Sequence, residues 1–240
     1  MRKLQVNYKI IAPINHKYGR INCCRNVNPF PIYSVKHSIT EFSVAVTGHT
    51  VNKAEAIERD LLYETGRKNT DRVSDLVLQK PELFEELFQV FAINQEPVSR
   101  RAAWVIDTFS EKYPEFIARH LNSIVDLLPT FGHDALKRHS LRILARSPLP
   151  SGDRLGLLMT KCFDWLISPA EAPAIKVYCM EILYRISQIE PELKKELSDT
   201  IEWRLNEESA GFKSRGRKIL CKLSREIEIT KDQNEHHQCM

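Results

Sequence analysis

Apolar residues recur every three or four positions from residue 52 to about residue 224, without the strict alternation that a half-buried strand shows. This spacing gathers the apolar side chains on one face of a helix. Proline opens several of the segments, as in Pro114-Glu-Phe and Pro191-Glu-Leu, where its missing N–H removes no helical hydrogen bond. The sequence therefore predicts an all-α protein, with helices over residues 52–65, 70–79, 82–93, 97–112, 114–129, 133–146, 152–168, 171–187, 191–207 and 210–224.

The helices repeat in pairs with a period of 37 to 39 residues. A pair of adjacent apolar residues recurs near the end of each second helix, at Val105-Ile106, Ile143-Leu144, Ile182-Leu183 and Ile219-Leu220. Three residues before each dipeptide stands a small residue, typical of a close approach between helices: Ala102, Ser140, Cys179 and Gly216. We therefore expect Cys179 to have a packing role rather than a catalytic one.

A unit of two helices at this period resembles the HEAT and armadillo types of helical repeat, over roughly residues 52–225. The resemblance implies a HEAT-like α-α superhelix, a right-handed solenoid of about five helix pairs.

The two ends of the chain differ in character from this repeat. Residues 1–50 mix proline, asparagine, cysteine, aromatic and basic residues without a sustained period, and 226–240 form a polar segment. We predict three parts: a leader over 1–50, a helical repeat domain over 51–225 and a flexible tail over 226–240. Two interpretations of the leader stay open. It is either a disordered basic arm or an extension upstream of a true start at Val51.

Charge and cysteine content exclude few classes of function. The formal net charge is +4, but residues 1–50 hold seven Lys or Arg and one acid, so the leader supplies the whole positive excess. Nucleic-acid binding therefore cannot be inferred from net charge alone. The six cysteines show no paired metal-ligand or disulfide spacing, and no apolar run reaches the roughly 18 residues of a membrane span. We predict a reduced protein in the cytoplasm that binds no metal or cofactor.

Aligning the repeats shows which residues the second helices present opposite their apolar stripe. Most are basic, and aromatic rings are interleaved with them. Arginine forks and aromatic faces suit recognition of charged or planar groups, although charge pairs between helices and packing of Trp104 explain the same pattern. The predicted binding residues are Arg100, Arg101, Trp104, Arg138, His139, Arg142, Arg146, Tyr178, Arg185, Arg215 and Lys218.

The stretch Ser99-Arg-Arg-Ala-Ala-Trp-Val-Ile-Asp107 also resembles the basic-then-aromatic helices of bacterial alkylpurine DNA glycosylases, which are built on HEAT-like repeats. That resemblance covers about ten residues. It implies a catalytic role for Asp107, which would stabilise a cationic sugar, with Trp104 stacking on a base and Arg142 holding phosphate.

Other signatures of catalysis do not occur in the chain. It contains no glycine-rich phosphate loop, no H-E-x-x-H and no G-x-S-x-G. We therefore predict a non-catalytic binding module or scaffold, whose Arg- and aromatic-rich face of second helices holds a protein or peptide. The alternative is a nucleic-acid binding protein, with a glycosylase-like DNA repair enzyme as its catalytic form. The oligomeric state stays open.

Overall fold

The computed structural model describes residues 49–238, and side chains from Glu55 to Ile229. Contacts divide the chain into two units, Met1–Thr47 and Gly48–Met240. The predictions made for the leader, residues 1–50, lie outside the described residues. The exceptions are residues 49 and 50, which begin the first described helix. In the described part every regular element is a helix, as the sequence predicts.

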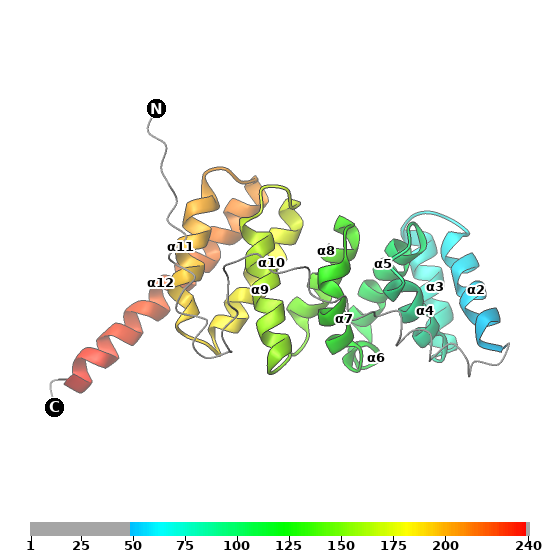
Figure 1. Cartoon of the computed structure of the whole chain (residues 1–240), viewed down its shortest axis with the longest axis horizontal. Coiled ribbons are helices and arrows are strands. Elements are labelled where there is room, and N and C mark those ends of the chain that lie inside the picture. Colours follow the sequence, from blue (N-terminus) through cyan, green and yellow to red (C-terminus); the bar gives the residue numbers. More distant parts are fainter. Residues whose placement is uncertain (1–48, 239–240) are drawn as a thin grey trace, which may run out of the picture. The chain divides into compact units, whose positions relative to one another are not determined.

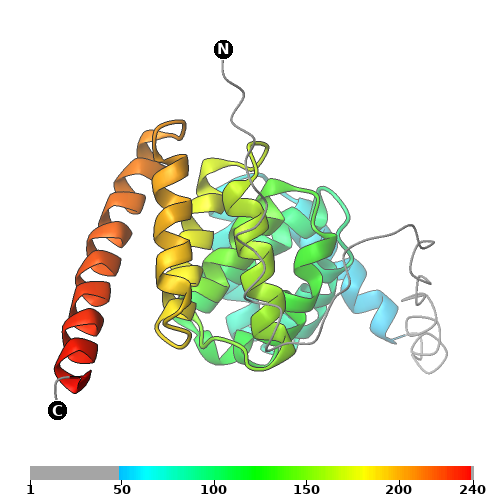
Figure 2. The ribbon, with the colours of Figure 1, turned by 60° about the vertical axis from the view of Figure 1, so that its left-hand side comes forward.

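In chain order the helices can be grouped into five pairs, each with a first and a second helix, and Figures 1 and 2 show how they are arranged. The first helices of the pairs are α2 (His49–Leu62), α4 (Leu83–Ala92), the divided helix α6 (Pro114–Ala118) and α7 (Leu121–Leu127), α9 (Asp153–Ile167) and α11 (Leu193–Leu205). The second helices are α3 (Arg67–Gln79), α5 (Val98–Lys112), α8 (Asp134–Arg146), α10 (Pro173–Ser187) and α12 (Ala210–Gln238). Each second helix packs on the next one, in the order α3, α5, α8, α10 and α12. The hand and curvature of a superhelix stay predictions.

The core lies where the repeating apolar stripe places it. All four dipeptides of the stripe contribute buried residues, among them Ile106, Ile143 and Leu183. The small positions are buried too, since Ala102, Ser140 and Cys179 are fully covered. At the equivalent Gly216, a Cβ atom would lie 3.0 Å from Cγ2 of Ile201, so the close approach of α12 to α11 favours glycine at this position.

The ends of most helices lie within about three residues of the prediction, but two helices differ more strongly. The helix expected over 114–129 is divided into α6, α7 and the short 3₁₀ helix η3 (Leu128–Thr130). His120, between α6 and α7, turns inward and stacks on Phe88 with a ring-centroid distance of 4.0 Å. A buried contact of this kind overrides helix propensity at the turn. The last helix continues to Gln238 because no glycine or proline follows Gly216. The flexibility expected for 226–240 stays a prediction.

Candidate binding face on the second helices

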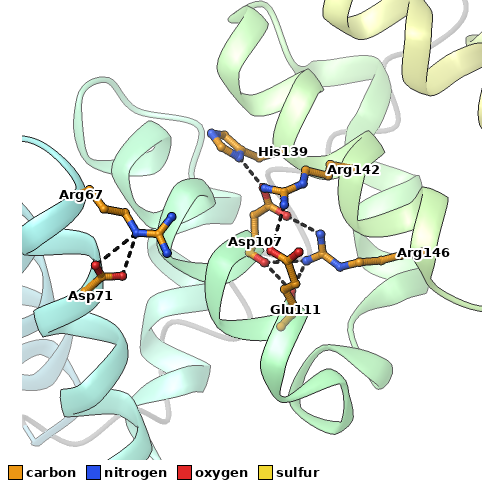
Figure 3. Close-up of polar contacts among 8 residues, drawn as sticks. Arg67, Asp71, Asp107, Glu111, His139, Arg142 and Arg146 are labelled. Carbon is orange, nitrogen blue, oxygen red and sulfur yellow. Dashed lines mark hydrogen bonds and ion pairs between the residues drawn. The ribbon is translucent and has the colours of Figure 1, made fainter. Parts of the chain in front are cut away.

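Asp107 lies at the centre of a cluster that joins α5 to α8 (Figure 3). Its side chain is completely buried. Oδ2 accepts hydrogen bonds from Nδ1 of His139 at 2.8 Å and Nη1 of Arg142 at 3.1 Å, and Oδ1 accepts one from Nη1 of Arg146 at 2.7 Å. Arg142 also donates to Glu111 at 2.9 Å. His139, Arg142 and Arg146 follow at i, i+3 and i+7, so one face of α8 surrounds one carboxylate.

The charges of this cluster are matched. Burial alone would raise the pKa of Asp107, but hydrogen bonds from His139 and Arg146 outweigh it and hold that pKa below its ordinary value. Burial alone would likewise lower the pKa of Arg142, and the carboxylates of Asp107 and Glu111 raise it. Asp107 and Arg142 are therefore both ionised at neutral pH, and the buried carboxylate lies between the guanidinium groups of Arg142 and Arg146.

The position of Arg138 identifies the tautomer of His139. Nη2 of Arg138 lies 3.3 Å from Nε2 of His139, and a guanidinium nitrogen can only donate. Nε2 is therefore the acceptor, and the ring proton resides on Nδ1, where it is donated to Asp107. The resulting chain of hydrogen bonds runs from buried Asp107 through His139 to the exposed Arg138.

Several predicted binding arginines bridge successive repeats. Nη2 of Arg146 donates to the backbone oxygen of Asp107 at 2.5 Å. One repeat later Arg185 donates to the backbone oxygens of Leu144, Ala145 and Ser147, at 2.9, 2.7 and 2.6 Å. Near the start of the domain Arg101 donates to the backbone oxygen of Leu61 at 2.9 Å. Arg101 and Arg185 thus satisfy carbonyl groups at the end of a helix of an earlier repeat, where intrahelical partners run out, whereas Arg146 adds a hydrogen bond to a carbonyl inside α5.

Two other predicted residues have carboxylate partners on the surface. Arg100 pairs with Glu96 at 3.0 Å, and Arg215 pairs with Glu181 at 2.7 Å. Lys218 is exposed on α12. Charge pairing thus accounts for many of the basic residues on the second helices, as one of the interpretations of their pattern expects.

The structure brings the remaining predicted residues together around two neighbouring cavities. One cavity, of about 420 Å³, is lined by Arg100, Arg101, Trp104, Arg138 and His139, with the first turns of α3 and α8. The other, of about 280 Å³, is lined by Trp104, Asp107, Arg138, His139, Arg142 and Tyr178. Because three residues line both, we call the two cavities together the α5–α10 groove. Arg146, Arg185, Arg215 and Lys218 do not line it.

A second set of charged side chains, which the sequence pattern did not predict, is buried between repeats. Lys137 pairs with Glu171 at 2.6 Å, and Lys176 pairs with Glu208 at 2.5 Å. Both lysines are at least nine-tenths covered. Their spacing of one repeat was the available signal, since a lysine recurring on the apolar side of the second helices predicts a buried partner.

A comparison with known protein families shows to which family the chain belongs. The HEAT repeat domain family matches residues 57–223, which is more than half of the chain. The chain belongs to this family. No curated protein and no solved structure matches it significantly. HEAT repeat domains generally bind other proteins rather than catalyse reactions, so the HEAT repeat assignment favours a binding module over an enzyme.

The described residues of this HEAT repeat domain contain no cluster of three His, Cys, Asp or Glu side chains arranged to hold a metal ion. None of their helices is long and apolar enough to cross a membrane. The catalytic role suggested for Asp107 stays a prediction, and both of its carboxylate oxygens already accept hydrogen bonds from the protein.

Proposed function

We propose that the chain is a non-catalytic HEAT repeat module that binds a protein or peptide in the α5–α10 groove. The observation that carries the proposal is the pair of cavities, which share Trp104, Arg138 and His139. Trp104 and Tyr178 are only half-buried there, so each ring presents apolar surface. Aromatic and arginine side chains around a concave surface are the groups that most often anchor protein interfaces.

The distribution of carboxylates favours a protein over a nucleic acid. A nucleic-acid backbone requires a continuous row of cations, because each phosphate carries a negative charge. Here Glu64 and Asp134 line the larger cavity, Glu96 neutralises Arg100, and Glu111 neutralises Arg142. A mixture of both signs with aromatic rings suits a polypeptide.

The burial of Asp107 argues against the glycosylase alternative. An acid that stabilises a cationic sugar must face that sugar across the open site. Asp107 has no exposed side-chain surface, and its oxygens are held by His139, Arg142 and Arg146. We propose a structural role for Asp107 instead, and we keep the cytoplasm as the proposed location.

Photo-cross-linking in the source cells tests the proposed function. A photoreactive phenylalanine analogue is placed at Tyr178 of the full chain, and at the exposed Arg217 of α12 as a control. We expect a protein that cross-links from position 178 and not from position 217. The same protein, once purified, should bind the wild-type chain and bind Arg138→Glu at least about tenfold more weakly.

A different outcome would assign the groove to another class of ligand. Salt-sensitive binding of duplex or single-stranded DNA that Arg138→Glu and Arg142→Glu both abolish would establish the nucleic-acid alternative. The absence of any cross-link specific to position 178, together with no DNA binding at low salt, would contradict the groove as a binding surface.

A further inference from the structure

Arg138 differs from the other arginines of the α5–α10 groove in its partners. Arg100 and Arg142 each pair with a carboxylate, and Arg101 donates to a backbone oxygen. Within the part of the chain that the structure describes, Arg138 contacts the imidazole of His139, and no carboxylate pairs with it. A guanidinium group has five N–H donors, so most of the donors of Arg138 stay available.

The surroundings hold this guanidinium in place. His139 is fixed because Asp107 accepts its Nδ1–H at 2.8 Å, and the ring then offers Nε2 to Arg138. Arg138 therefore projects into both cavities with part of its orientation already set. Prior ordering of a side chain lowers the entropy lost when a ligand binds.

Two rings lie on the same side of α8 as this cation. Trp104 comes from α5 and Tyr178 from α10, and both line the cavity of about 280 Å³ with Arg138. A cavity of this volume has room for an amino-acid side chain. An apolar side chain there would displace water from two aromatic faces.

We propose that the α5–α10 groove recognises a short acidic–apolar motif in a partner polypeptide. A carboxylate of the motif pairs with Arg138, and a neighbouring apolar or aromatic side chain enters the cavity between Trp104 and Tyr178. This inference rests on the proposed function and specifies the chemistry of the partner. The carboxylates of Glu64 and Asp134 at the larger cavity restrict the motif to few negative charges, because a strongly acidic run would be repelled.

Selection from a phage-displayed library of random dodecapeptides tests the motif. The library is panned in parallel against the immobilised full chain, against Arg138→Ala and Tyr178→Ala, and against the matched control Arg217→Ala. Arg138 and Arg217 are both exposed on second helices, so their truncation is expected to leave the fold intact. Circular dichroism of each variant verifies the fold before panning.

The expected result is enrichment of peptides with Asp or Glu near an aromatic or aliphatic residue, on the wild type and on Arg217→Ala. Synthetic copies should bind Arg138→Ala at least about tenfold more weakly than wild type, and replacement of their acid by the amide should have a similar effect. The fluorescence of Trp104 should change on binding, and Trp104→Phe should lose that change.

The outcomes separate this motif from the proposed function. Enriched peptides that depend on Tyr178 but lack acidic residues, or bind Arg138→Ala equally well, would overturn the motif and leave a peptide-binding groove. Enrichment unaffected by every groove substitution would contradict both proposals.

Discussion

Replacing Asp107 by asparagine tests whether the central cluster holds α5 and α8 together. The substitution keeps size and shape, removes the negative charge and turns an N–H group toward cationic donors. Removal of one partner from a fully buried ion pair costs about 3–5 kcal/mol. Arg142 and Arg146 keep 37% and 27% of their side-chain surface exposed, so both can turn partly toward water after the change.

We therefore expect Asp107→Asn to lower the free energy of unfolding by about 2–3 kcal/mol. For a domain of this size the melting temperature should fall by about 4–12 °C. Thermal unfolding followed by circular dichroism at neutral pH measures the change. Glu111→Gln is the matched control on the same helix, because its carboxylate pairs with Arg142 at the surface, and it should cost less than about 1 kcal/mol.

The pH dependence supplies a second measurement on the same pair of proteins. The pKa of Asp107 is lower in the folded chain, so its contribution is present above the unfolded pKa and is lost as pH falls through the folded value. The difference between wild type and Asp107→Asn should be constant near neutrality and shrink from about pH 4 downward. A melting temperature within about 1 °C of wild type would refute a structural role for Asp107.

Three further predictions follow from buried groups. Glu208→Gln should cost about 3–5 kcal/mol in chemical denaturation, because Lys176 would be left charged and covered. Burial lowers the pKa of His120, so protonation favours the unfolded chain, and stability should decline as pH falls below about 6.5; His120→Gln should show a smaller decline. Burial raises the pKa of the Cys179 thiol well above its ordinary value, so iodoacetamide should label the exposed Cys221 of the native protein and spare Cys179.

A specific result would contradict each of these three predictions. The control Asp199→Asn removes the exposed ion pair between Lys195 and Asp199. If this variant lost as much stability as Glu208→Gln, burial of the ion pair between Lys176 and Glu208 would not matter. If the stability of the wild type and of His120→Gln declined in parallel as pH falls, the imidazole of His120 would not be the cause of the decline. For the thiols, mass spectrometry showing native Cys179 labelled as fast as Cys221 would disprove its burial.

Periodicity predicted the fold because every repeat buries the same stripe. The apolar dipeptides and small positions such as Cys179 lie where the alignment of repeats puts them. The division of the helix at His120 escaped prediction, because it depends on a ring contact with Phe88, a residue from another helix. A single-helix pattern contains no information about such a partner.

The candidate site was predicted in composition but not in pairing. The alignment of repeats compares equivalent positions, so it did not show that the carboxylate of Asp107 lies opposite positions 139, 142 and 146 of the next second helix. Separations near one repeat length between an acid and several bases were the available clue. Arg138 could be distinguished from Arg142 and Arg146 only once those partners were known.

The arginine bridges also give the chain a direction. Arg101, Arg146 and Arg185 each satisfy carbonyl groups that precede them in the sequence, so a repeat acquires its last hydrogen bonds from the repeat that follows. On a ribosome the N-terminal repeats emerge first. Each of the first three pairs of helices would lack these hydrogen bonds, and the second would also hold Asp107 without its partners on α8, until the next pair leaves the exit tunnel. Synthesis would therefore complete these contacts one repeat at a time.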